Sequence, residues 1–173
     1  MSTTISREYT SSQVPSSVAA TALRWFRLAL GTASDAGPVI ARLTLAGILA
    51  PHGAQHGLGL LGGYGFSGTL GWMTKTLGFP APLAAIGIVT ELVAPLLLLL
   101  GAGGRLAALA VIGLMLGAIR THVANGFFMN WFAAMPAGSE GFEYHLLVVA
   151  LAAIVVVKGS GALSLDRRLG ARR

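Results

Sequence analysis

The sequence is short of charge and has no cysteine. Only 10% of its 173 residues are charged and 54% are hydrophobic, whereas a soluble domain carries about 25% charged residues. So few charges cannot coat a water-facing surface, and the composition predicts an integral membrane protein. The absence of cysteine excludes disulfides, thiolate metal sites and a cysteine nucleophile.

The N-terminal segment lacks the apolar core of a cleavable signal peptide. Residues 1–15 are rich in Ser and Thr and predict a disordered tail. Residues 16–32 predict a short amphipathic helix on the inner membrane surface, and a frayed juxtamembrane segment is the alternative. Residues 1–36 would therefore form a polar tail and an interfacial helix, with the N-terminus in the cytoplasm.

Four apolar stretches predict membrane-spanning helices, because a span needs about 20 residues. The predicted spans are residues 39–61, 81–100, 106–122 and 142–157. A glycine-rich loop (62–80) and an aromatic-rich loop (125–141) would connect them on one side, and a tight turn (101–104) on the other. The predicted fold class is an all-α membrane protein, an up-down bundle of four transmembrane helices over residues 37–158.

The net charge of +6 comes from basic residues near the chain ends and in one short turn. No basic run alternates with aromatics, so we expect no nucleic-acid partner. Cytoplasmic loops carry the excess of Lys and Arg in membrane proteins, which predicts that both termini, including the basic tail 159–173, are cytoplasmic. The predicted outer loops hold only Lys75.

Glu91 is the ionisable residue that most needs an explanation, because charge is costly inside a bilayer. It lies in the second predicted span, about 15 Å from the outer end and near the membrane midplane. Pro95 follows one turn later, removes the N–H that would bond the carbonyl of residue 91, and kinks the helix.

Other polar side chains belong to the outer half of the predicted bundle. His52 is nearly level with Glu91, and His56 lies one turn further out on the same face. We expect a polar pocket open to the outer face, formed by His52, His56, Glu91, Arg120, His122, Glu143, Tyr144 and His145. In the alternative interpretation, Glu91 only pairs with Arg42, Arg120 or a histidine, and the outermost residues are plain surface.

Three kinds of ligand would suit these side chains. Haem would use His52 and His145 as axial ligands, and a zinc or iron ion would use His52, His56 and Glu91. A quinone would need an apolar slot, a His or Arg donor for its carbonyls and a carboxylate to relay protons. The quinone fits best and would lie near His52 and Glu91, although the residues alone do not single it out, and we assign no metal ligand.

The third predicted span contains a G-x-x-x-G pair, Gly113 and Gly117. Small residues let helix backbones approach closely in lipid. We expect this pair to pack within the bundle rather than to form a dimer.

Several motifs occur in a fixed order along the chain. They are RLTLAGILAPHGAQHG (Arg42 to Gly57), Gly78-Phe79-Pro80-Ala81-Pro82, Glu91, Asn125-Gly126-Phe127-Phe128, Glu143-Tyr144-His145-Leu146-Leu147, Gly159-Ser160-Gly161 and Ser164-Leu165-Asp166. The set resembles the DoxX family of small bacterial and archaeal membrane proteins, over roughly residues 40–169. His56 departs from the family pattern, in which we expect a Lys.

The resemblance implies a four-helix protein of the prokaryotic cytoplasmic (inner) membrane. The family looks like the membrane subunit of thiosulfate:quinone oxidoreductase, which implies a redox partner protein, a quinone and no autonomous enzyme activity. By this resemblance, the residues that correspond to the family's characteristic positions are Arg42, His52, Glu91, Asn125, Glu143 and His145. A small proton or solute transporter that uses Glu91, or a purely structural scaffold, is the alternative function.

Overall fold

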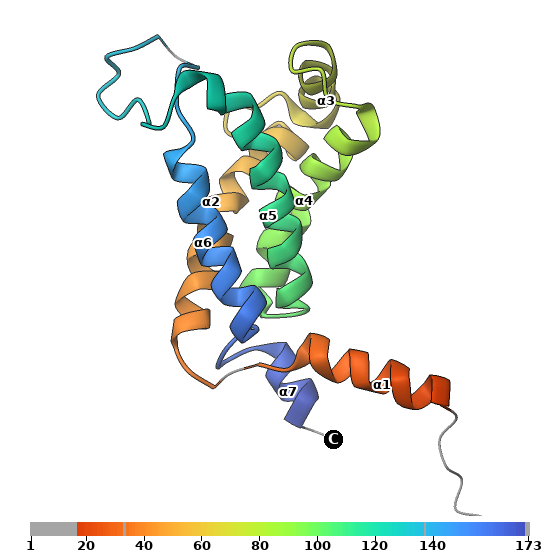
Figure 1. Ribbon diagram of the computed structural model, residues 1–173. Helices are drawn as coiled ribbons and strands as arrows, with labels where there is room; N and C mark the ends of the chain where they lie inside the picture. Colours follow the sequence, from red (N-terminus) through yellow and green to blue (C-terminus); the bar gives the residue numbers. More distant parts are fainter. Residues whose placement is uncertain (1–16, 33, 137, 172–173) are drawn as a thin grey trace, which may run out of the picture.

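A computed structural model describes residues 17–32, 34–136 and 138–171, which form helices and loops without a strand (Figure 1). The tail predicted over residues 1–15 lies outside the described residues. The elements are α1 (Ser17–Leu30), α2 (Gly37–Leu58), α3 (Gly65–Lys75), α4 (Ala81–Leu100), α5 (Gly104–His122), the 3-10 helix η1 (Val123–Asn125), α6 (Glu143–Lys158) and α7 (Leu165–Ala171).

The all-α prediction is confirmed, and the predicted helices lie within three residues of the observed bounds. Two segments differ from the prediction. Residues 62–80 were expected to be a loop, but α3 forms there although glycine is a poor helix former. It forms because it packs against α2 and α4 and buries Thr69. The predicted tail after residue 158 contains the short helix α7.

The long helices α2, α4, α5 and α6 form an antiparallel bundle (Figure 1). We call the end that carries α1 and α7 the terminal end, and the end that carries α3 and the loop 126–142 the loop end. In the described chain, α4 and α5 with its extension to Asn125 are long and apolar enough to cross a membrane. Their outward faces expose leucine, isoleucine and valine, as a lipid-facing surface would.

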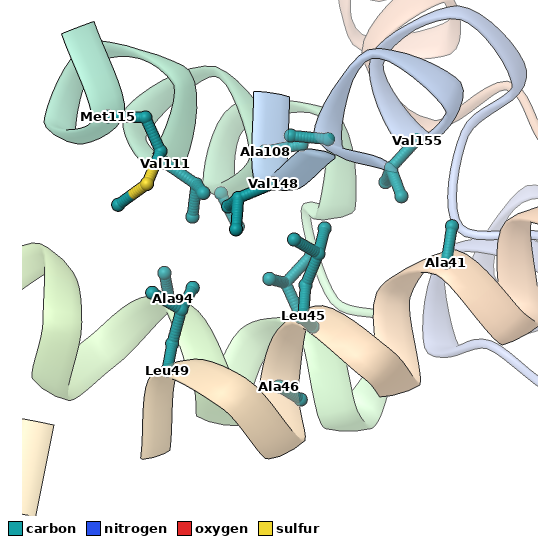
Figure 2. Close-up of a cluster of buried hydrophobic side chains, with 13 residues drawn as sticks. Ala41, Leu45, Ala46, Leu49, Ala94, Ala108, Val111, Met115, Val148 and Val155 are labelled. Carbon is teal, nitrogen blue, oxygen red and sulfur yellow. The ribbon is translucent and has the colours of Figure 1, made fainter. Parts of the chain in front are cut away.

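The hydrophobic core fills the half of the bundle nearer the terminal end. All four long helices contribute, and many of the side chains are small (Figure 2). Alanines such as Ala46, Ala108 and Ala152 are 5% exposed or less, and they let the helices approach closely. Leu49, Met115 and Val148 lie at the upper limit of this core and also line the cavity described below.

At the terminal end of the bundle, Arg42 connects α2 to the end of α4 and to the segment that precedes α7. Its side chain is 2% exposed, and its guanidinium donates to the carbonyls of Ser160 (2.9 Å), Leu98 (2.8 Å), Leu99 (2.7 Å), Ala162 (3.4 Å) and Leu163 (2.9 Å). Two of these carbonyls, those of Leu98 and Leu99, belong to the last turn of α4, where a cation is favoured by the helix dipole. Arg42 therefore pairs with backbone groups, and the suggested Arg42–Glu91 pair is wrong.

Close packing of α2 on α4 occurs at Gly53 and Gly57. α4 continues through Pro95, and the carbonyl of Glu91, which Pro95 leaves without its helical partner, lies where a Cβ on Gly53 would be. A Cβ on Gly57 would overlap the Leu92 side chain. The helix-packing glycine pair of this bundle is therefore Gly53-x-x-x-Gly57.

The predicted packing role of Gly113 and Gly117 is wrong. Nothing lies within 4 Å of a Cβ placed on Gly113, and a Cβ on Gly117 would meet only the ring of Phe79, at 3.9 Å. Both glycines line the cavity instead. The G-x-x-x-G spacing alone does not say which face of a helix meets a neighbour.

Candidate functional site

A cavity of about 490 Å³ lies in the half of the bundle nearer the loop end. Residues from α2, α3, α4, α5 and α6 line it, and most of its wall is apolar. All four histidines of the chain are on this wall. The ionisable and aromatic polar residues of the lining are His52, His56, Glu91, Arg120, His122, Tyr144 and His145.

On one wall, α2 and α4 bring a histidine and a carboxylate into contact. Nδ1 of His56 lies 2.6 Å from Oε2 of Glu91. The Glu91 side chain is 14% exposed and that of His56 is 35% exposed, so both still reach the cavity. The ring of His52 lies 5.9 Å from that of His56. The partner of Glu91 is therefore His56, one of the options left open above.

On the facing wall, α5 and α6 bring two further histidines together. The rings of His122 and His145 lie 4.8 Å apart, and Nδ1 of His122 donates to the carbonyl of Glu140 at 2.7 Å. His145 is 9% exposed, and its Nδ1 has no hydrogen-bond partner among the described residues. The Tyr144 ring lies 5.9 Å from that of His145. This wall can offer a second polar contact to a molecule in the cavity.

Arg120 lies at the edge of the cavity. Its guanidinium carbon stacks over the Phe79 ring, 5.2 Å from the centroid, and the side chain is exposed. In the described part of the chain no carboxylate lies within 4.0 Å of it. Its charge is thus available to a ligand or a lipid headgroup.

Glu143 and Asn125 do not line the cavity, although Glu143 was predicted there. Oε2 of Glu143 accepts the N–H of Met129 at 3.1 Å. The side-chain amide of Asn125 donates to the carbonyls of Gly138 (3.1 Å) and Glu140 (3.0 Å). Both residues hold the loop 126–142, and Asn125 also shares the Glu140 carbonyl with His122.

α3 is the part of the site that the sequence did not reveal. Thr69, Trp72 and Met73 all face the cavity, and the buried Thr69 hydroxyl has no hydrogen-bond partner among the described residues. Their spacing of three and four residues is the helical signal that could have found this wall. Gly71, a poor helix former between them, made this helical pattern hard to recognise.

The metal site considered for His52, His56 and Glu91 is not formed within the described ranges of the chain. Among the residues that the structure describes, no three His, Asp or Glu side chains gather as a metal site would require. The geometry instead offers two polar walls across an apolar space. Such a space suits a flat, mostly apolar molecule with a hydrogen-bond acceptor at either end.

Comparison with known proteins identifies a family for part of the chain. The DoxX family model matches residues 37–131, from the start of α2 to the loop after η1. No curated protein and no solved structure matches the chain. The matched segment includes His56, Glu91 and Arg120, whereas α6 with Tyr144 and His145 lies beyond it.

Proposed function

Because the chain belongs to the DoxX family, we propose that it is the membrane subunit of a redox complex and that its cavity binds a quinone. A partner redox protein would supply the electrons. The proposal rests on the contact of His56 with Glu91 inside an apolar cavity. All four histidines of the chain line that cavity.

We further propose that α2, α4, α5 and α6 all cross the membrane, with the terminal end in the cytoplasm. α2 has 22 residues and α6 has 16, which at about 1.5 Å per residue span roughly 33 and 24 Å. Lys158 at the end of α6 can extend toward the interface. Arg24, Arg105, Arg167 and Arg168 lie at the terminal end, which supports a cytoplasmic position.

Quinone reduction needs two electrons and two protons. The pair of His56 and Glu91 can supply one of the protons. With Nδ1 bonded to Glu91, the imidazole keeps Nε2 for a second partner. An imidazole bonded to a carboxylate can hold one proton and pass it to an acceptor. The pair would deliver one proton to one quinone oxygen, and the second proton would reach the other oxygen from the His122–His145 wall.

The apolar wall explains why a quinone suits the cavity better than a charged solute. A neutral ring loses little solvation on entering an apolar space, whereas an ion would lose much. The polar groups at the two walls then fix its orientation.

The first prediction concerns the proton-handling pair. Glu91→Gln and His56→Ala should each lower quinone reduction by the complex at least about a hundredfold, because general acid–base catalysis contributes about 10²–10⁴-fold. Membrane insertion and thermal stability in detergent should stay close to wild type. Quinone reduction by membranes supplied with the partner's electron donor measures the effect.

Glu140→Gln is the matched control. It makes the same chemical change outside the cavity lining and keeps the backbone carbonyl that His122 and Asn125 use. Its activity should equal wild type. Unchanged quinone reduction in both Glu91→Gln and His56→Ala would refute the proposal, and Glu91-dependent flux in partner-free proteoliposomes would indicate transport instead.

A further inference from the structure

The lipid-facing surface of α5 runs along one stripe of the helix. Leu106, Leu109 and Leu116 on this stripe are 65%, 51% and 59% exposed. Gly113 and Arg120 are exposed on the same stripe. On the adjacent helix α4, Leu83 (53%) and Ile86 (62%) are also exposed.

Some of these outward-facing residues also line the cavity. Leu83 and Ile86 of α4, and Gly113 and Arg120 of α5, belong to both surfaces. The cavity is only partly enclosed, and residues that line it and are also exposed mark where it reaches the outer surface. The cavity therefore opens sideways between α4 and α5, toward what would be the hydrocarbon region of the bilayer.

Glycines keep this opening clear of side chains. Nothing lies within 4 Å of a Cβ on Gly113, and a Cβ on Gly117 would touch only Phe79, at 3.9 Å. On α4, Gly87 adds no side chain of its own and lies beside the ends of the Leu114 and Met73 side chains. The result is an apolar groove between the two helices, continuous with the cavity and bounded at the loop end by Arg120 stacked on Phe79.

We propose that Leu83, Ile86, Gly113 and Gly117 form a lateral portal through which a lipid-soluble ligand enters the cavity. The ligand carries a hydrocarbon tail, which rests in the portal over the two glycines while the polar head reaches the cavity. This inference rests on the proposed function for the identity of the head. It adds that the substrate carries a hydrocarbon tail and enters from the membrane. A water-soluble substrate without a tail would not occupy the portal.

Gly113→Leu tests the portal by filling it. The new side chain enters open space and replaces a poor helix former, so we expect the variant to fold. The probes are a benzoquinone with a ten-carbon tail and the same benzoquinone without the tail, added to protein in nanodiscs. Binding of the tailed probe should weaken at least tenfold, while binding of the tail-less probe should change less than twofold.

Ala110→Leu is the matched control, because Ala110 is exposed on the same helix and does not line the cavity. It should bind both probes like wild type. The portal is wrong if Gly113→Leu affects neither probe or weakens both equally, or if Ala110→Leu reproduces its tail-selective loss.

A second measurement separates this inference from the quinone proposal. Since the chain has no cysteine, Gly113→Cys can carry a single bimane label. Phosphatidylcholine brominated in mid-chain should quench that label, and aqueous iodide should not. If wild type binds neither benzoquinone, the quinone proposal fails, while quenching by the brominated lipid still supports an opening that faces the hydrocarbon region. Quenching by iodide and not by the brominated lipid would overturn the portal in either case.

Discussion

At the residue scale, Gly53 controls how closely α2 approaches α4. An added Cβ would collide with the carbonyl oxygen of Glu91, which belongs to backbone and cannot swing aside. Pro95 removes the usual partner of this carbonyl, and the carbonyl lies closely against the Gly53 backbone. The same contact sets the position from which the Glu91 side chain reaches His56.

Gly53→Ala should therefore destabilise the bundle. Overpacking of a close contact costs about 1–3 kcal/mol, and the shift of α4 should also weaken the contact of His56 with Glu91. Thermal unfolding in detergent measures the loss of stability. Gly47→Ala is the control on the same helix, because nothing lies within 4 Å of its added Cβ. It should be neutral or slightly stabilising, and equal loss in both variants would contradict the explanation.

At the element scale, α5 begins with a cap supplied by a distant part of the chain. The residue before the helix, Gly103, has no side chain with which to cap it. The carboxylate of Asp166 accepts the N–H groups of Gly103 (2.7 Å) and Gly104 (3.1 Å) and the hydroxyl of Ser160 (2.7 Å). A carboxylate at a helix N-terminus satisfies free donors and opposes the dipole. The short helix α7 thus holds the turn between α4 and α5.

Asp166→Ala should lower the stability of the whole bundle. The substitution leaves buried donors without a partner, which costs about 1–3 kcal/mol for each, and it removes a negative charge near the buried Arg42. Asp35→Ala is the control, since the Asp35 side chain is 49% exposed in its 3.3 Å pair with Lys158. Exposed pairs contribute about 0–1 kcal/mol. Detergent or urea unfolding of the two variants should differ clearly, and equal midpoints would refute the capping role.

At the scale of the whole molecule, the two halves of the bundle differ in construction. The half nearer the terminal end is packed with small side chains and closed by Arg42 and Asp166. The half nearer the loop end encloses the cavity and its histidines. With a closely packed half at the terminal end and a cavity with polar walls at the loop end, the bundle would admit a ligand in one half of the membrane and remain closed in the other half.

The proposed topology gives a prediction at this scale. Ala134→Cys lies in the loop 126–142 and Gly170→Cys lies in α7, and both positions are exposed. With the terminal end in the cytoplasm, a membrane-impermeant maleimide added to intact spheroplasts should label only Ala134→Cys. Both should react after lysis, which controls for reactivity. Labelling of Gly170→Cys in intact spheroplasts would invert the proposed orientation.

Part of the site could be predicted from the sequence because burying charge in an apolar helix is costly. Glu91 and the histidines stand out against their surroundings for that reason, and they do line one cavity. The roles of Glu143, Asn125 and the glycines Gly113 and Gly117 could not be predicted, because each depends on the direction in which a side chain or helix face points. Asp166 appeared only as part of a motif, since the N–H groups that it caps, those of Gly103 and Gly104, lie more than sixty residues away.

Composition and hydropathy by themselves determined that this is an all-α protein with apolar spans, because few charges and long apolar runs leave no other way to bury the backbone. The ordered motifs determined its family. Only the tertiary structure decided that Glu91 meets His56, that Arg42 binds carbonyls, and that α3 closes a cavity open between α4 and α5. These depend on how helices rotate and pack against one another, and a linear pattern records the spacing of residues but not the neighbours that each face will meet.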